Sequence, residues 1–218
     1  MGQKVHPVGM RIGINRGWNS SWFGTKRNYA SLLHQELRIR EYLDTQFNGL
    51  GVSYVELAQN NNIVDLKIHT AKPGLIIGQQ GAKIEELKEK LHSKFNLNFS
   101  IEVIEIRKPA IDAAIVADSI AKQLERRISY RRACKAAIEK AMEQGAKGIK
   151  ISLGGRLNGV EIARSEFFTR GKIPLHTLRA DIDYKNVRAQ TTYGAIGIKV
   201  WVYHGEVFDR SAKKETSK

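Results

Sequence analysis

The sequence predicts an α+β protein with two domains, and three observations support this prediction. At 218 residues, the chain exceeds the size of about 100–150 residues that is commonest for a single domain. Hydrophobic residues recur at helical and strand spacings in the first half of the chain and again in the second half. The step Lys108-Pro109 separates the two halves, because the residue before a proline is biased away from helix.

Residues 1–27 are predicted to form a basic N-terminal arm. They are rich in Gly, Asn, Ser and Arg and contain isolated aromatic rings, which is typical of a segment anchored at a few points rather than of a packed domain. Residues 1–40 contain seven Lys and Arg against the single acid Glu36, a net charge of +6. We interpret the arm as a tether; a solvated basic tail would have the same composition.

Residues 28–108 are predicted to form a compact α+β domain. The first helix ends at Asn48-Gly49, and apolar residues then alternate with polar ones over 64–68, as in a half-buried strand. After a loop that contains two glycines, apolar residues recur every three or four positions, which predicts a further helix. The expected elements are a helix over 29–47, strands over 52–58 and 64–68, a short helix from Pro73, a helix to Phe95 and a strand over 100–106.

Residues 109–208 are predicted to form a second α+β domain, in which two helices pack on a mainly antiparallel sheet. Apolar residues form a row on each helical stretch, and Gly145 ends the second. Gly154-Gly155 fits a hairpin turn better than a phosphate-binding loop, which would need a Lys and a following helix. Residues 209–218 are predicted to be a disordered polar tail. The expected elements are helices over 110–128 and 130–144 and strands near 149–153, 160–168, 181–191 and 195–203.

The formal net charge of +14 favours a polyanionic partner. Nucleic acid fits best. An acidic membrane surface is the weaker alternative, because no apolar run approaches the length of about 18 residues that a spanning helix needs. The single cysteine, Cys134, cannot form an internal disulfide, and no signal peptide is recognisable, which fits a reducing cytosol. We expect no membrane association.

The stretch Gly78-Gln79-Gln80-Gly81 is the strongest candidate binding site. Because glycine lacks a Cβ, the backbone there can adopt unusual dihedral angles and a ligand can approach the amides closely. Residue 81 also begins a helix, whose first N–H groups and dipole favour phosphate. Both central residues are uncharged, so Lys72 and Lys83 would supply the positive charge. A purely structural turn is the alternative.

A second basic cluster lies at the start of the helix expected over 130–144. In helical projection Arg131 and Lys135 lie roughly 40° apart, and Arg132 lies roughly 60° beyond them, at the edge of an apolar stripe. With only Glu139 nearby, these cations repel one another unless phosphates lie between them. A solvated helix face is the alternative.

No catalytic, metal or cofactor site is predicted. The six histidines lie far apart without the spacing of a zinc site, and a single cysteine offers too few thiolate ligands. Asp181 and Asp183 share one face of a strand, as the metal-binding carboxylates of a nuclease would. Beside Arg179, Lys185 and Arg188, they fit a cross-strand charge network better. A nuclease is therefore kept as the rival hypothesis.

The run IIGQQGAKI, from Ile76 to Ile84, resembles the GXXG loop of KH domains, and the helix-first order of elements resembles the prokaryotic (type II) KH fold. KH loops that grip RNA strongly usually carry Lys or Arg where this chain has two glutamines, so the resemblance implies a moderate grip. We expect the isoleucines to belong to the core rather than to a base-binding groove. The residues implied at the RNA are Lys72, Gly78, Gln79, Gln80, Gly81 and Lys83.

Longer motifs resemble the bacterial small-subunit (30S) ribosomal protein S-three family along nearly the whole chain. They include MGQKVHPVGMRIGI at the start, IRKPAIDAAIVADSIAKQLERRISYRRACKAAI in the middle and KIPLHTLRADIDY towards the end. The resemblance implies a structural constituent of the head of the small ribosomal subunit, in the cytoplasm, that binds small-subunit (16S-type) rRNA. A free regulatory RNA-binding protein of the KH type is the nearer alternative.

The resemblance also implies contacts with mRNA and with other proteins. In that family, basic residues at a helix start contact mRNA at the entrance to the messenger channel and help passively to part its duplexes; the matching residues are Arg131, Arg132 and Lys135. The implied neighbours are ribosomal proteins S-ten and S-fourteen, with S-four and S-five nearby. Neither a cofactor nor a metal is implied. The residues of the arm and surface expected to bind rRNA are Lys4, His6, Arg11, Arg16, Lys26, Arg27, Arg156, Arg164 and Arg179.

Overall fold

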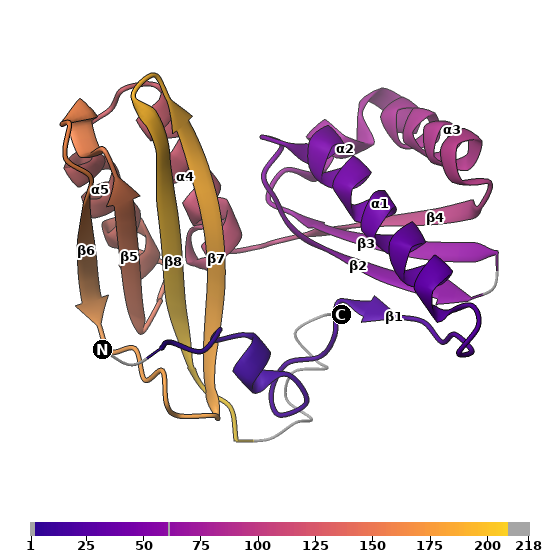
Figure 1. Ribbon diagram of the computed structural model, residues 1–218, viewed down its shortest axis with the longest axis horizontal. Helices are drawn as coiled ribbons and strands as arrows, with labels where there is room; N and C mark the ends of the chain where they lie inside the picture. Colours follow the sequence, from indigo (N-terminus) through magenta and orange to yellow (C-terminus); the bar gives the residue numbers. More distant parts are fainter. Residues whose placement is uncertain (1–2, 61, 209–218) are drawn as a thin grey trace. The chain divides into compact units, whose positions relative to one another are not determined.

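The computed structural model describes residues 3–60 and 62–208, which divide into two compact units (Figure 1). The central unit comprises residues 18–107, and the terminal unit comprises residues 3–17 together with 108–208. Each unit has its own hydrophobic core. In these ranges, no helix is both long and apolar enough to cross a membrane.

The division into units differs from the predicted organisation at the N-terminus. Residues 1–27, predicted as one arm, are shared: the part up to Gly17 belongs to the terminal unit, and the part from Trp18 belongs to the central unit. The predicted break at Lys108-Pro109 lies within one residue of the division between the units. The predicted tail, 209–218, falls outside the described residues.

The central unit is a four-stranded sheet covered on one face by helices (Figure 1). Its elements are β1 (Ser20–Ser21), α1 (Tyr29–Phe47), β2 (Val52–Asn60), β3 (Ile63–Thr70), α2 (Pro73–Ile77), α3 (Ala82–Phe95) and β4 (Asn98–Glu105). In the sheet order β1-β2-β3-β4, only β2 and β3 pair antiparallel; the other two pairs are parallel. The order from α1 to β4 is the one predicted for a prokaryotic-type KH fold.

The helices of the central unit pack on one face of the sheet, to which every second residue of β3 points. Val64, Leu66 and Ile68 are buried there. Leu43 of α1 and Leu91 of α3 belong to the same hydrophobic cluster. Burial of each such side chain contributes roughly 1.5–3 kcal/mol. The alternation read from the sequence thus sets which face of the sheet the helices cover.

A carboxylate of α1 fastens the short strand β1 to the central unit. Glu36 is buried and accepts hydrogen bonds from the Ser20 hydroxyl and, at 2.6 Å, from Trp22 Nε1. It also accepts one from Arg40 Nε at 2.7 Å. Burial alone would raise the pKa of Glu36, but these hydrogen bonds and the Arg40 charge outweigh burial and hold the pKa below its ordinary value.

Replacing Glu36 with Gln is expected to destabilise the central unit by about 1–3 kcal/mol at neutral pH, because Arg40 loses its charged partner. Since the folded pKa of Glu36 is depressed, its contribution is complete above the unfolded pKa of about 4.3 and is lost as pH falls through the folded pKa. Urea unfolding of parent and variant between about pH 3 and 7 measures this difference. The exposed Glu41→Gln change is the control and should have no effect. A Glu36 effect that stays constant with pH would contradict the assignment.

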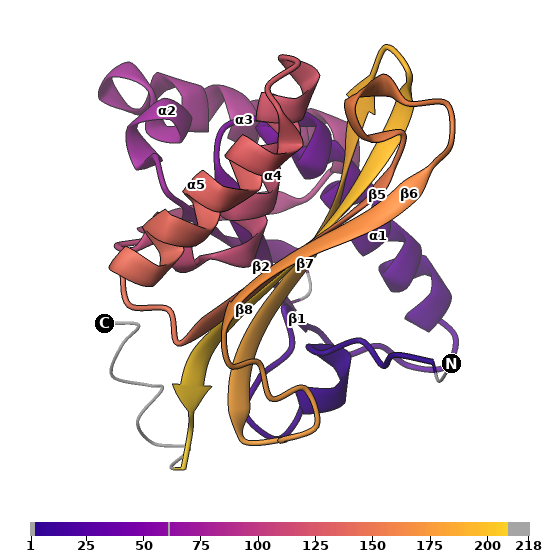
Figure 2. The ribbon, with the colours of Figure 1, turned by 90° about the vertical axis from the view of Figure 1, so that its left-hand side faces the viewer.

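The terminal unit is a four-stranded antiparallel sheet with two helices on one face (Figure 2). Its elements are α4 (Ala113–Glu125), α5 (Tyr130–Glu143), β5 (Gly148–Gly155), β6 (Arg164–Gly171), β7 (Ala180–Thr191) and β8 (Gly194–Glu206). The sheet order is β6-β5-β8-β7. Ile120 of α4 and Ile138 of α5 meet Ile151 and Val200 of the sheet in one core. The predicted arrangement of two helices on an antiparallel sheet is confirmed.

The helix α4 begins at a side-chain cap. Asp112 Oδ1 accepts hydrogen bonds from the N–H groups of Ala114 at 3.0 Å and Ile115 at 3.1 Å. These groups would otherwise lack partners inside the helix, so an aspartate at this position defines the helix start. The cap also explains why the helix begins three residues later than predicted, since Pro109–Ile111 form a separate 3₁₀ turn.

The N-terminal segment of the terminal unit is held by a buried arginine. Arg11 is fully buried. Its guanidinium donates to the backbone carbonyls of Ala180 at 2.8 Å, Leu175 at 2.9 Å and Thr177 at 3.0 Å. A further hydrogen bond joins it to the carbonyl of Pro7 at 2.8 Å. Because all of these are well-formed bonds, Arg11 fixes the segment against the start of β7.

Candidate nucleic-acid interface

The glycine loop has the backbone geometry that its two glycines make accessible. Gly78 has φ of 74°, Gly81 has φ of 84°, and Gln80 between them has φ of 49°. At Gly78 a Cβ atom would also lie only 2.7 Å from Lys83 Cγ, whereas at Gly81 it would meet no atom within 4 Å. Glycine is therefore required at Gly81 by conformation and at Gly78 by both conformation and space. The side chains of Gln79 and Gln80 are exposed.

The loop is flanked by two exposed cations and two exposed apolar side chains. Lys72 precedes α2, and Lys83 lies in the first turn of α3, where its ammonium group donates to the Leu75 carbonyl at 3.4 Å. Leu75 and Ile77 are exposed at 46% and 37%, whereas Ile76 between them is buried in the core. The assignment of the isoleucines to the core therefore holds for Ile76 but not for Ile77. Such a surface can offer apolar contact to bases beside charge for phosphates.

The second basic cluster occupies the first turns of α5. Arg131, Arg132 and Lys135 are all exposed, and no acidic residue lies in the first turn of the helix. Cations at a helix N-terminus oppose the helix dipole, at a cost of roughly 0.3–1 kcal/mol each, whereas an anion there is stabilised. Within the described ranges, the side chains of Arg132 and Lys135 form no ion pair or hydrogen bond. The cluster is therefore suited to a phosphate chain.

One acid that the sequence did not point to lies beside this cluster. Glu166 of β6 accepts a hydrogen bond from the Tyr130 hydroxyl at 2.9 Å, and its Oε1 lies 3.8 Å from Arg131 Nη2 and 3.4 Å from Arg164 Nε. Arg131 Nε also donates to the Tyr130 hydroxyl at 3.1 Å. Glu166 thus orients both Arg131 and Arg164. Arg164, which was predicted to bind rRNA, therefore lies close to Arg131, which was predicted to bind mRNA.

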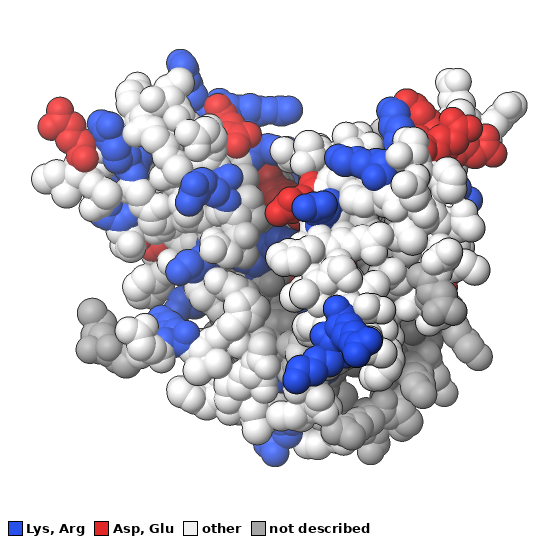
Figure 3. Space-filling view, turned by 45° about the vertical axis from the view of Figure 1, so that its right-hand side comes forward, with Lys and Arg blue, Asp and Glu red and all other residues white. Residues whose placement is uncertain are grey.

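The other residues predicted to bind rRNA differ in how much of each side chain is free. Arg156 donates to the carbonyls of Val160 and Tyr193 and is half-buried, and Arg179 pairs with Glu206 at 2.6 Å. Arg11 is fully buried, so its guanidinium offers no exposed donor to a phosphate. This burial contradicts the prediction of a surface contact for Arg11. Lys and Arg side chains are nevertheless spread over the face shown in Figure 3, where Asp and Glu gather in a few groups. The exposed residues of the set are Lys4, His6, Lys26, Arg27, Arg164 and Arg179.

The carboxylates considered for a nuclease are held by other groups. Arg16 bridges Asp181 and Asp183, at 3.3 Å from each. Asp183 Oδ2 also accepts a hydrogen bond from the N–H group of Ala113 at 2.8 Å. The predicted charge network is present, but its cation is Arg16 of the N-terminal segment rather than a neighbour on the strand. Of the residues that the structure describes, no three His, Cys, Asp or Glu side chains are grouped to hold a metal.

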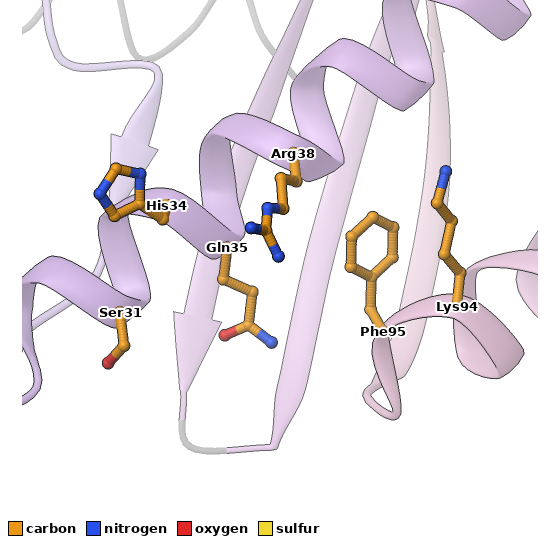
Figure 4. A pocket seen from close by; sticks show the side chains of 6 residues that line it. All are labelled: Ser31, His34, Gln35, Arg38, Lys94 and Phe95. Atoms are coloured by element: carbon orange, nitrogen blue, oxygen red, sulfur yellow. The ribbon is translucent and has the colours of Figure 1, made fainter.

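A groove that sequence reasoning missed lies between α1 and the end of α3. Its volume is about 620 Å³. Figure 4 shows Arg38 and Lys94 reaching it from the two helices, with the ring of Phe95 between them. The ammonium group of Lys94 lies 4.3 Å from the centre of the Tyr42 ring, so this cation already has an aromatic partner. The residues that line the groove are Ser31, His34, Gln35, Arg38, Lys94 and Phe95.

Comparison with known proteins reveals relatives that match along the whole chain. The "Small ribosomal subunit protein uS3" of Carboxydothermus hydrogenoformans is 50% identical over 217 residues, which cover 100% of this chain and 98% of that protein. The protein of the same name from Enterococcus faecalis is 50% identical over 218 residues, covering 100% and 99%. The chain belongs to the ribosomal protein S3 family. This membership confirms the family resemblance recognised in the sequence motifs.

Two family models divide the chain much as the structure does. The model described as "KH domain" matches residues 38–111, which include the glycine loop and its flanking lysines. The model described as "Ribosomal protein S3, C-terminal domain" matches residues 120–202, which include α5 and its basic cluster. The glycine loop and the basic cluster of α5 therefore lie in different domains of the two that the family models describe.

Proposed function

We propose that this chain is a structural constituent of the small ribosomal subunit in the cytoplasm and that it binds the rRNA of that subunit. Support comes from full-length relatives named as small ribosomal subunit proteins and from the KH domain, whose loop carries the two flanking cations Lys72 and Lys83. The net charge of +14 would be neutralised by rRNA. The exposed basic residues of the surface extend the contact.

The finer proposal concerns mRNA. Arg131, Arg132 and Lys135 would hold the phosphates of mRNA at the entrance to the messenger channel, and the observation that carries this proposal is their exposed position at the N-terminus of α5. Contacts to phosphate stabilise a separated strand against its duplex, so these residues would favour unwinding without hydrolysing a nucleotide. Motion along the messenger would be driven elsewhere in the ribosome.

The protein neighbours belong to the same proposal. By resemblance to its family, the chain would contact ribosomal proteins S-ten and S-fourteen and lie near S-four and S-five. Crosslinking in assembled subunits, followed by identification of the linked peptides, tests these four neighbours. Sedimentation of the cellular protein with small subunits separates this function from that of a free regulatory RNA-binding protein, which would sediment separately.

Replacing Arg131, Arg132 and Lys135 with Ala is expected to slow translation through a stable mRNA hairpin by about twofold or more, because three phosphate contacts are lost. Messengers without structure should be translated at the parent rate. The measurement is the elongation rate of reconstituted ribosomes on matched messengers with and without the hairpin. The charge-conserving variant R131K/R132K/K135R is the control and should retain most of the activity. Equal rates on both messengers for the Ala variant would refute the proposed role in unwinding.

A further inference from the structure

The face of the terminal unit's sheet that turns away from α4 and α5 carries an unusual set of side chains. Ile149, Ile151 and Leu153 of β5 are buried against the helices. Because side chains alternate along a strand, Lys150 and Ser152 point to the opposite face. The registers of the sheet place residues of the other strands beside them.

Three rows of side chains cross this face from strand to strand. Among the twelve residues of these rows, there are three aromatic side chains, three cations and no carboxylate. The first row is Thr169, Lys150, Trp201 and Tyr184, the second is Phe167, Ser152, Lys199 and Asn186, and the third is Ser165, Gly154, Gly197 and Arg188.

An aromatic ring lies open to solvent on the edge strand β6 of this face. Phe167 is 68% exposed, although it lies on a paired strand rather than in a loop. The ammonium group of Lys150 lies 5.4 Å from the centre of the Phe167 ring and 5.4 Å from that of Trp201. Both spacings are those of cation–π contacts. The lysine thus holds the ring beside it while its charge stays at the surface.

The cations of this face have no acidic partner among the described residues. Lys150 and Lys199 form no ion pair there, and Lys4 of the N-terminal segment lies close enough to Lys150 to repel its charge. Burial, followed by this repulsion from Lys4, lowers the pKa of Lys150. An anion bound between Lys4 and Lys150 would relieve their repulsion. The charge of the face is therefore complementary to a polyanion.

Trp201 and Tyr184 are packed with Ile173 and Leu175, whereas the third row leaves room for a chain to approach the sheet. Gly154 and Gly197 are neighbours in the third row and present no side chains. Arg188, which is exposed, follows them on β7. β-Sheets bind single-stranded RNA by combining aromatic rings, on which bases stack, with cations that hold the phosphates. This face has such a ring next to cations on adjacent strands, and a stretch of backbone without side chains.

We propose that this sheet face binds a single-stranded segment of RNA, with a base stacked on Phe167 and phosphates held by Lys150 and Lys199. It is a contact separate from the glycine loop, which belongs to the central unit, and from the basic cluster of α5, which lies on the other side of the sheet. A protein partner with an apolar surface fits less well, because it would bury unpaired lysines.

Binding of a fluorescent twelve-residue oligouridylate to the purified full-length chain at low salt tests the proposal. In the background R131A/R132A/K135A with Gln79→Asp and Gln80→Asp, which weakens the other two candidate RNA sites, Phe167→Ala is expected to weaken binding about three- to tenfold, because one stacked base is lost. Phe167→Tyr keeps the ring and should bind as the background does. Thermal unfolding of each variant checks the fold, which should be unaffected because the ring is largely exposed. Equal affinities of the Ala variant and its background would overturn the proposal.

A second measurement in assembled particles distinguishes RNA from protein as the occupant. A photoreactive phenylalanine analogue at position 167 should crosslink to rRNA in small subunits. Crosslinking to a ribosomal protein alone would overturn the proposal, even if the chain still sediments with the subunit and so retains its proposed function. The same analogue at position 167 in the α5 variant R131A/R132A/K135A should give the same rRNA crosslink, since the two sites are separate.

Discussion

Replacing Arg11 with Met is expected to lower the free energy of unfolding of the terminal unit by about 3–5 kcal/mol. The guanidinium donates to the carbonyls of Ala180, Leu175, Thr177 and Pro7, and Arg11 is fully buried. Methionine fills much of the same volume but has no N–H group, so buried carbonyls would lose their partners. The N-terminal segment should then detach from the start of β7.

Urea unfolding followed by native-state hydrogen exchange of the amides near Ala180 measures this effect. Arg11→Lys serves as an intermediate case: it keeps the charge, but an ammonium group cannot reproduce the planar fork of donors, so part of the stability should be lost. Lys4→Met is the surface control and should change stability little. A loss below about 1 kcal/mol in Arg11→Met would show that the observed hydrogen bonds do not hold the segment.

Replacing Gln79 and Gln80 together with Asp is expected to weaken RNA binding by the KH domain about 10- to 100-fold. Both side chains are exposed at the tip of the loop, where a bound phosphate would come close to each new carboxylate. Repulsion between unit charges about 4 Å apart amounts to roughly 1 kcal/mol in water and more near a protein surface. Asp also tolerates the φ of 49° found at Gln80, so the loop should keep its conformation.

The matched controls for the loop differ only in charge. Gln79→Asn with Gln80→Asn keeps the amides and should bind RNA as the parent does, whereas Lys at both positions should bind more tightly. Fluorescence anisotropy with a short single-stranded RNA, repeated at several salt concentrations, measures both the affinity and the number of phosphate contacts. If the Asp and Asn variants bind equally, the loop does not lie at the RNA.

Local patterns explain why so much of the fold could be predicted. The helix and strand periodicities depend on neighbours a few residues away, so β3, α3, β5, β7 and β8 were expected close to their observed bounds, whereas β6 begins four residues later than expected. The glycine loop was recognisable for the same reason, because two glycines before a helix have a direct conformational meaning. Its positive φ angles at Gly78 and Gly81 agree with that reading.

The features that could not be predicted depend on partners far away in the sequence. Arg11 was assigned to the surface because nothing near it reveals that Ala180, 169 residues later, accepts its hydrogen bond. Glu166 was missed as the partner of Arg131 because it lies on a strand, and only the fold brings β6 beside the start of α5. The exposure of Phe167 was hidden likewise, since Phe167 and Phe168 are adjacent and both apolar, so that the pattern does not tell which of the two faces the helices cover.

The docking of the first residues against β7 has a consequence for synthesis of the chain. Arg11 leaves the ribosome long before Ala180, and at about 5–20 residues per second the interval of 169 residues takes roughly 10–30 s. During that time residues 18–107 can fold around their own core, while Arg11 still lacks the carbonyl groups near Ala180 that accept its hydrogen bonds. A nascent chain interrupted before β7 would thus present its guanidinium to any nearby polyanion, and completion of the strand would withdraw it.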